Sequence, residues 1–271
     1  MIKFRNIKFE KSIFIDSSDL GEIRKWNETG VIDGVTTNQY IFLKERIKRR
    51  EVGQVLKKIC AEMKGKPVSI ELTDSGKEVK ALVEEARELS RIATNVIVKV
   101  PLIPGTTKSL CVIEKLIKLN IAVNVTLLMT YEQIIMAILA TRFARQESFV
   151  SLFWGRTIED QAQYRSRSDF VAKYPKLGMG SDVNRSPKSI VEATMRFLKE
   201  GNYTNPKLII GSIRTASMVG EAFASGANIV TVTPDVLNMM LFSQRTLETM
   251  EQFDESWKQM QQLQNKKNGK R

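Results

Sequence analysis

The residue with the clearest chemical potential is Lys99, which lies near the end of an apolar, β-branched run at residues 96–101. Alternation along a strand places Lys99 on the same face as Ile97, and three valines on the other face. Both faces are mostly apolar, which indicates a strand of a buried parallel sheet. Burial disfavours the charged ammonium, and the neutral amine is the nucleophile. The plainer alternative is a strand-end lysine whose head reaches solvent.

Polar residues end most of the other predicted strands, where a core would hold Val, Ile or Leu. They are Asp16, Thr36 and Asn38, Glu71, Asn124 and Thr126, Ser151, and Ser212 and Arg214. Each has an ordinary alternative of its own, such as a helix cap for Asp16 or a turn for Asn38. Together with Lys99 they form an acid/base and nucleophile set that needs no metal.

Two arginines follow neighbouring predicted strands. Ser212 and Arg214 lie at a strand-to-helix turn, and Arg156 lies just after the preceding strand. A helix N-terminus offers free N–H groups to an anion, and the arginine fork suits phosphate. Either arginine alone would be read as a surface residue. As a pair they predict a phosphate site.

The amino-acid composition excludes several classes of active site. The chain of 271 residues has no histidine, so His-based triads and most zinc sites are excluded. Its 2 cysteines, Cys60 and Cys111, indicate reduced thiols and a cytoplasmic protein. We expect neither a signal peptide nor a membrane span, because no apolar run is long enough.

The net charge of +12 allows two interpretations. One is nucleic-acid binding, and the other is a solvated basic surface with part of the excess in the tail at residues 265–271. The basic residues are scattered along predicted helices, and no aromatic-interleaved patch appears. We therefore expect no nucleic-acid partner and no membrane partner.

Strand and helix patterns alternate eight times along the chain. Strands are predicted at residues 12–16, 31–38, 67–72, 95–101, 120–127, 148–153, 207–213 and 227–232. Helices are predicted from a cap at Ser17 or Ser18 to about Gly30, and at 40–64, 74–93, 106–119, 131–141, 187–200, 215–224 and 234–264. Residues 157–186 are polar and are predicted to form a long loop with helical pieces.

This alternation is typical of an α/β fold, a single (β/α)8 TIM barrel, with its active site at the carboxyl ends of the strands. The predicted domain spans residues 1–271, with a core at about 12–245, an extended C-terminal helix at about 234–264 and a basic tail. An open doubly wound sheet is the alternative. It would usually carry a glycine-rich turn after the first strand, where this chain has residues 16–19, Asp-Ser-Ser-Asp.

The same strand-end residues carry a resemblance to a known family. Over about residues 12–245 the chain resembles transaldolases and their relatives, the fructose-6-phosphate aldolases. The matching segments are Phe14-Ile15-Asp16, Gly34-Val35-Thr36-Thr37-Asn38, Val68-Ser69-Ile70-Glu71, Ile97-Val98-Lys99-Val100-Pro101, Asn124-Val125-Thr126-Leu127-Leu128, Val150-Ser151 with Gly155-Arg156, and Gly211-Ser212-Ile213-Arg214.

The resemblance implies a class I, Schiff-base mechanism without metal or other cofactor, acting on a sugar phosphate or a related anionic sugar. It implies that Lys99 attacks the ketose carbonyl, that Asp16 is the acid/base, and that Glu71 and Thr126 hold the catalytic water. The implied substrate-binding residues are Thr36, Asn38, Asn124, Ser151 and Phe153, and the implied phosphate-binding residues are Arg156, Ser212 and Arg214.

Two positions favour transfer of a dihydroxyacetone unit over simple cleavage. Glu71 stands where the aldolase relatives tend to carry Gln, and Phe153 where they tend to carry a proton-donating tyrosine. The alternatives are an aldolase that releases free dihydroxyacetone, and a barrel without chemistry that serves in binding or assembly. Retention of Lys99, Asp16 and Glu71 argues against the latter.

The chain also departs from the family pattern. Gln39-Tyr40 replace a usual Pro-Ser, Leu152 and Trp154 replace a usual Pro and Val, and the segment 157–186 is longer than in short members. If all lie at the mouth of the site, they predict an altered pocket for a modified sugar phosphate, a sulfo-sugar or a larger anionic sugar.

The last predicted helix carries more apolar surface than one barrel needs. Its apolar residues are Val236, Leu237, Met240, Leu247, Met250, Phe253 and Trp257. Small members of the family assemble through such a helix, and the resemblance therefore implies a homo-oligomer.

Overall fold

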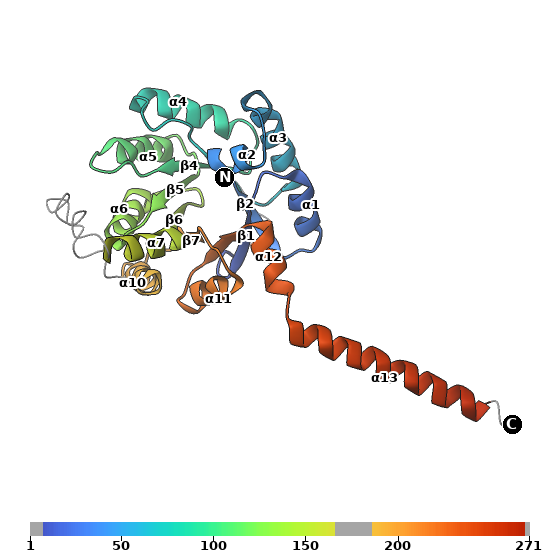
Figure 1. The fold of residues 1–271 in the computed structure, drawn as a ribbon. Coiled ribbons are helices and arrows are strands. Elements are labelled where there is room, and N and C mark those ends of the chain that lie inside the picture. Colours follow the sequence, from blue (N-terminus) through green and yellow to red (C-terminus); the bar gives the residue numbers. More distant parts are fainter. Residues whose placement is uncertain (1–7, 166–185, 269–271) are drawn as a thin grey trace.

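Eight parallel strands close into a barrel in chain order, and helices surround it (Figure 1). The computed structural model describes residues 8–165 and 186–268. The strands are β1 (Ser12–Asp16), β2 (Ile32–Thr36), β3 (Val68–Glu71), β4 (Val96–Pro101), β5 (Val123–Leu128), β6 (Phe149–Phe153), β7 (Lys207–Gly211) and β8 (Ile229–Val232). The predicted (β/α)8 barrel is confirmed.

A helix follows each strand and packs on the outside of the barrel. The helical elements are α1 (Leu20–Glu28), α2 (Gln39–Lys44), the 3-10 turn η1 (Arg49–Glu51), α3 (Val52–Glu62), α4 (Val79–Ser90), α5 (Lys108–Lys118), α6 (Tyr131–Thr141), α7 (Trp154–Arg165), α10 (Pro187–Glu200), α11 (Ala216–Ala224), α12 (Pro234–Leu241) and α13 (Gln244–Asn268). All but α13 lie against the barrel, whereas α13 projects away from it (Figure 1).

Side-chain alternation on the strands builds two separate apolar layers. On β4 the valines pack in the core between the strands and the helices, whereas Ile97 belongs to a second cluster with Phe9, Phe14 and Phe149. The three phenylalanine rings meet edge to face, with centroids 5.5 to 5.9 Å apart. These residues form an apolar floor inside the barrel, below the strand ends.

Polar side chains lie two residues beyond this floor on the same strand faces. Asp16 follows Phe14, Lys99 follows Ile97 and Ser151 follows Phe149. Because successive side chains alternate between the two faces of a strand, these polar groups also point into the barrel, one layer nearer its open end. The strand pattern thus gathers the polar groups into one ring.

The prediction of a single helix at 40–64 is wrong, because two separate helices, α2 and α3, span these residues. Arg46 adopts a left-handed backbone conformation, with φ of 61°, and no α-helix continues through such a residue. Helix α2 ends before it, and α3 begins only after the turn η1. Apolar residues continue at helical spacing on both sides, so the sequence pattern hides the break.

The predicted cap of the first helix is also wrong. Asp19 caps α1, since its Oδ1 accepts hydrogen bonds from the N–H groups of Gly21 and Glu22 at 2.7 and 3.0 Å. The hydroxyls of Ser17 and Ser18 instead donate to the Glu45 carboxylate. The contact with Glu45, which comes from a distant segment, occupies the two serines that were predicted as caps, and Asp19 caps the helix instead.

The C-terminal helix is broken where one helix was predicted. Phe242 is extended, with φ of −93° and ψ of 130°, and it separates α12 from α13. Helix α13 includes the first residues of the predicted tail and ends at Asn268. The rest of the predicted tail, residues 269–271, lies outside the described residues.

Other boundaries also differ from the prediction, among them the start of the fifth strand. The fifth strand begins at Val123 and not at residue 120, because Asn120 is left-handed with φ of 58° and belongs to the preceding turn. The segment 157–186, predicted as a long loop with helical pieces, begins within helix α7. Its residues 166–185 lie outside the described part of the chain.

Asn95, just before the strand that carries Lys99, ties this strand to the end of α3 and to the turn that follows α3. Its buried amide donates to the carbonyls of Cys60, Met63 and Lys66 at 3.1, 3.0 and 2.9 Å. We predict that Asn95→Ala lowers the free energy of unfolding by about 2–4 kcal/mol, because it removes a buried amide that donates to three carbonyls and leaves a cavity in its place. Urea denaturation measures the loss.

Asn95→Asp should cost more at neutral pH, because a carboxylate would face the same carbonyl oxygens. The exposed neighbour Thr94 provides the control. Thr94→Ala should change stability by no more than about 0.5 kcal/mol. Equal stability of the two alanine variants would contradict a tethering role for Asn95.

Candidate active site

A cavity of about 360 Å³ opens at the carboxyl ends of the strands. It is lined by Asp16, Thr36, Asn38, Lys99, Thr126, Ser151, Phe153, Arg156, Ser212 and Arg214 among the predicted residues, and by Tyr40, Ile41, Lys44, Glu45, Gly211, Ile213, Thr231, Thr233, Pro234 and Asp235. The two predicted residues outside this lining are Glu71 and Asn124. Each contacts a residue that lines the cavity.

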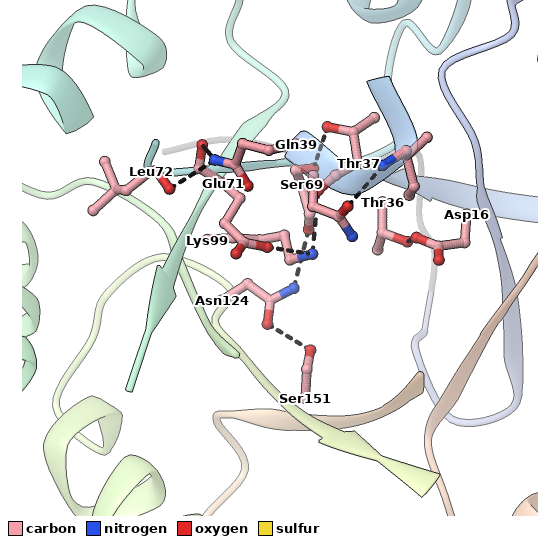
Figure 2. A network of polar contacts seen from close by, with 12 residues as sticks. Asp16, Thr36, Thr37, Gln39, Ser69, Glu71, Leu72, Lys99, Asn124 and Ser151 are labelled. Atoms are coloured by element: carbon pink, nitrogen blue, oxygen red, sulfur yellow. Dashed lines mark hydrogen bonds and ion pairs between the residues drawn. The ribbon is translucent and has the colours of Figure 1, made fainter. Parts of the chain in front are cut away.

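An ion pair between Lys99 and Glu71 lies at the centre of the site (Figure 2). Lys99 Nζ is 3.0 Å from Glu71 Oε2, and the two side chains are 4% and 9% exposed. The pairing follows from strand register, because Glu71 and Lys99 are direct neighbours on β3 and β4. Nζ also donates to the carbonyl of Thr37 at 3.2 Å. The lysine is therefore held away from solvent by two oxygen partners.

Asp16 lies on the opposite side of the ring from this pair, next to Thr36 (Figure 2). Thr36 Oγ1 donates to Asp16 Oδ1 at 2.5 Å and lies 2.6 Å from Thr231 Oγ1. A threonine hydroxyl has one proton, so the Thr231 hydroxyl must donate to Thr36 in turn. This chain of two hydroxyls holds the carboxylate in one orientation.

The environment of Asp16 raises its pKa above the ordinary value for an aspartate. Burial of the carboxyl group is the main cause, because the charged form loses its hydration. The positive charge of Lys99 and the hydrogen bond from Thr36 act in the opposite direction. A carboxyl group with a raised pKa holds a proton more readily than an ordinary aspartate, which suits a group that both accepts and returns one.

Asn124 and Ser151 form a second fixed pair beside Lys99. Ser151 Oγ donates to Asn124 Oδ1 at 2.7 Å, and the Asn124 amide donates to Ser69 Oγ at 3.2 Å. Asn124 is the direct neighbour of Lys99 on β5. Ser69 was not singled out from the sequence. Its position two residues before Glu71 on one strand face is the signal that identifies it.

The remaining predicted residues of the inner site differ in what they contact. The Thr126 hydroxyl lines the cavity, is buried, and has no hydrogen-bond partner in the described part of the chain. Asn38 Oδ1 caps α2 by accepting from the N–H of Ile41 at 3.0 Å, so the turn or cap alternative for this residue is also realised. Phe153 lines the cavity from the end of β6.

The predicted phosphate residues meet at the loops after β6 and β7. Arg156 lies in the first turn of α7, and Ser212 and Arg214 lie between β7 and α11. Gly155 N–H donates to the carbonyl of Ser212 at 3.0 Å. A Cβ atom at Gly155 would overlap that carbonyl, so this close approach requires glycine.

Sequence reasoning missed several residues of the cavity. Thr231 is one, although its position on β8, two residues after the buried Ile229, is the alternation that marks the other polar groups. Lys44 and Glu45 are others, because α2 was predicted as part of a long surface helix. Nothing in their spacing indicates that α2 lies over the cavity mouth.

The departures from the family pattern are not all at the mouth, contrary to the expectation. Tyr40 lines the cavity and is 70% exposed. Leu152 and Trp154 are buried at 0% and 2% exposure and belong to the core between strands and helices. Leu152 alternates on β6 with Ser151 and Phe153, which line the cavity, and therefore points outward. Trp154 is the first residue of α7.

Over the described residues, no group of three or more Cys, Asp or Glu side chains is placed to hold a metal ion. No helix within residues 8–165 or 186–268 is long and apolar enough to cross a bilayer.

Sequence comparison identifies the family of this site. The model of the transaldolase/fructose-6-phosphate aldolase family matches residues 13–269. The chain belongs to this family. A probable transaldolase of Clostridium tetani is 32% identical over 249 residues, which cover 91% of this chain and 98% of that protein. A probable transaldolase of Petrotoga mobilis is 32% identical over 256 residues, which cover 94% and 99% of the two chains.

The similar solved structures support the fold only, because their sequences are 8% and 12% identical to this chain. The carboxyl transferase domain of Rhizobium etli pyruvate carboxylase superposes with a TM-score of 0.52 at 8% identity, over 85% of this chain and 41% of that chain. A 2,3-dimethylmalate lyase superposes with a TM-score of 0.50 at 12% identity, over 94% of both chains. The protein is thus an enzyme of the transaldolase/aldolase type on a (β/α)8 barrel.

The hydrogen bond from Thr36 to Asp16 yields a pH prediction for this family member. The bond lowers the pKa of Asp16, so Thr36→Val should raise that pKa further above the ordinary value. Asp16 then ionises only at a higher pH than in the wild type. A carbon-13 NMR titration of the aspartate carboxyl groups measures this directly and does not depend on turnover.

Thr194→Val is the matched control for Thr36→Val. Thr194 is a buried threonine on α10 whose hydroxyl donates to the carbonyl of Ile190 at 2.8 Å. This variant should leave the titration of Asp16 unchanged. A Thr36→Val variant in which Asp16 titrates at the wild-type pH or below would refute the assigned role of the bond.

Proposed function

We propose that this enzyme is a transaldolase that transfers a three-carbon dihydroxyacetone unit from a ketose phosphate or a related ketose to an aldehyde acceptor. The reaction proceeds through a Schiff base on Lys99. One observation carries the proposal: a buried lysine amine 3.0 Å from a carboxylate, at the base of the cavity. Membership in the transaldolase/fructose-6-phosphate aldolase family supports the same chemistry.

Imine formation begins with loss of a proton from Lys99. Glu71 is suited to accept this proton because its carboxylate is already paired with Nζ. The neutral amine adds to the ketone carbonyl, and the carbinolamine then loses water. Glu71 and Thr126 are the residues proposed to hold that water. The buried Thr126 hydroxyl supports this role, since it lines the cavity and has no hydrogen-bond partner among residues 8–165 and 186–268.

Cleavage of the carbon–carbon bond requires a base and an electron sink. Asp16 takes the proton from the hydroxyl next to the bond, and the bonding electrons move into the protonated imine. The donor aldehyde leaves and a three-carbon enamine stays on Lys99. Addition of this enamine to an acceptor aldehyde, with return of the proton from Asp16, forms the new bond, and water then releases the product ketose. The raised pKa of Asp16 suits a group that both takes and returns a proton.

The other residues of the cavity are proposed to bind the sugar. Thr36, Asn38, Asn124, Ser151 and Phe153 are the proposed contacts of the three-carbon unit. Arg156, Ser212 and Arg214 are the proposed contacts of the phosphate group. The two arginines lie at the rim and are 58% and 50% exposed, whereas Lys99 is buried. This arrangement suits a substrate with a carbonyl at one end and an anion at the other.

The proposed reaction needs no metal or other cofactor, because the protonated imine is itself the electron sink. The partner is a small anionic sugar, and neither nucleic acid nor a membrane is involved. We infer a cytoplasmic location, which the free thiols of Cys60 and Cys111 support. Tyr40 and Lys44 at the cavity rim support a substrate with a further polar or anionic group.

A fructose-6-phosphate-type aldolase is the second candidate, because the family description names both activities. It would release dihydroxyacetone from fructose 6-phosphate in the absence of any acceptor aldehyde. Phe153 at the cavity argues for transfer, since phenylalanine has no proton to donate to the enamine.

Borohydride trapping with fructose 6-phosphate tests the Schiff base. We expect a stable adduct on Lys99, identified by peptide mass spectrometry, and none in Lys99→Met. Lys66→Met is the matched control, since Lys66 lies at the opposite end of the barrel, before β3. This variant should form the adduct as the wild type does.

The outcomes of trapping separate the candidates. An adduct together with acceptor-dependent product supports the transaldolase. An adduct with free dihydroxyacetone and no acceptor requirement replaces it with the aldolase. No adduct with fructose 6-phosphate or any other ketose tested would leave the non-catalytic barrel as the better explanation and would refute both enzymes.

We also propose that the chain forms a homo-oligomer through α13. This helix projects from the barrel with an exposed apolar stripe, Leu247, Met250, Phe253, Trp257, Met260 and Leu263. The stripe recurs every three or four residues, which is the spacing of one helix face. Val236 and Leu237, by contrast, are buried on the chain's own barrel, so they are not available for assembly.

Charges placed in the stripe should dissociate the oligomer. We predict that Phe253→Glu combined with Trp257→Glu lowers the mass measured by light scattering to that of one chain. Gln259→Glu combined with Gln262→Glu adds the same charge on the other side of α13 and should leave the mass unchanged. An equal mass for both double variants would rule out assembly through this stripe.

A further inference from the structure

The two arginines of the proposed phosphate site share one partner. Glu159 Oε2 lies 3.1 Å from Arg156 Nη1, and Glu159 Oε1 lies 2.9 Å from Arg214 Nη2. Glu159 was not singled out from the sequence. It follows Arg156 by three residues on α7, which places both side chains on one helix face.

This arrangement imitates a bound anion. One carboxylate presents an oxygen to each arginine, as a phosphate group would. The three side chains together carry a net charge of +1, and the two arginines without Glu159 would carry +2. The carboxylate therefore takes up hydrogen-bond donors and positive charge that an incoming anion needs.

We propose that Glu159 is an internal competitor for the phosphate site. It bridges Arg156 and Arg214 when the site is empty, leaves them when the phosphate group of a substrate binds, and so lowers the affinity of the site for phosphate. This inference rests on the proposed function, because it assigns the two arginines to the sugar phosphate.

The exposure of the three groups makes such an exchange feasible. The side chains of Arg156, Glu159 and Arg214 are 58%, 42% and 50% exposed. Ion pairs in contact with water are individually weak, so a phosphate dianion can displace the carboxylate. The displaced Glu159 can be hydrated, and no buried charge is left unpaired.

A backbone hydrogen bond joins the two segments that carry the arginines. The N–H of Gly155 is bonded to the carbonyl of Ser212, which ties the start of α7 to the loop after β7. Ser212 is left-handed with φ of 59°, a conformation uncommon for a residue with a side chain. We therefore assign the exchange of carboxylate for phosphate to a movement of the Glu159 side chain, while the two segments stay joined.

Competition of this kind has a consequence for turnover. Return of Glu159 to the arginines assists the departure of a phosphorylated product, and it opposes retention of inorganic phosphate. The effect is confined to ligands that carry the phosphate group. Glu159 is therefore proposed as a specificity-determining residue and not as a catalytic one.

Calorimetric titration with inorganic phosphate tests this directly. Glu159→Gln should bind phosphate about threefold to tenfold more tightly than the wild type, the range expected when one or two exposed ion pairs no longer compete. Arg214→Ala should abolish the binding in both backgrounds. Trapping of the neutral ketone dihydroxyacetone on Lys99 should be unchanged by Glu159→Gln.

Glu84→Gln is the matched control. Glu84 also approaches two arginines, Arg87 at 3.8 Å and Arg91 at 3.9 Å, and it is 53% exposed on α4, outside the cavity. This variant makes the same charge change and should leave phosphate affinity at the wild-type value.

Unchanged or weaker phosphate binding by Glu159→Gln would overturn the proposal and make Glu159 an orienting partner of the arginines. Absence of phosphate binding by the wild type and Glu159→Gln alike would overturn it as well. Neither result bears on the Schiff base, because trapping on Lys99 with a neutral ketone tests that chemistry separately.

Discussion

The buried ion pair between Lys99 and Glu71 is the constraint on which the rest of the site depends. Two opposite charges at 4% and 9% exposure lose most of their hydration, and such a pair rarely stabilises a fold more than apolar side chains would. It persists because adjacent strands hold both partners in register. Closure of the barrel thus supplies what a lysine nucleophile needs, a dry position with a proton acceptor beside it.

The barrel interior is graded from dry to wet along its axis. The apolar floor around Phe14 and Phe149 closes one end, the ring of Lys99, Glu71 and Asp16 lies above it, and the arginines stand at the rim. Covalent chemistry is favoured where water is excluded, and capture of an anion is favoured where the cation stays accessible. One substrate that spans both levels would meet the two requirements at once.

The alternation of side chains between the two faces of each strand made much of this arrangement predictable from the sequence. The run around Lys99 specified a strand, its two faces, and a polar layer two residues beyond an apolar one. The repetition of strand and helix specified the barrel, and the barrel specified the end at which polar residues meet. Within the helices the pattern was less informative. The breaks at Arg46 and Phe242 lie in stretches where apolar spacing continues, because backbone conformation at one residue leaves no trace in periodicity.

By itself, the sequence determined the fold class, the strand faces and most of the candidate site, since these follow from residue type and local spacing. Tertiary structure alone decided which polar groups became partners. Glu45 accepts hydrogen bonds from Ser17 and Ser18, the two residues predicted to cap the first helix. Thr231 on β8 lies within hydrogen-bond distance of Thr36 on β2. Glu159 forms ion pairs with two arginines from different loops. Leu152 and Trp154 were assigned to the mouth and lie in the core. The physical reason is that a hydrogen bond or an ion pair depends on distances of about 3 Å between groups far apart in the chain, and only the closed barrel sets those distances.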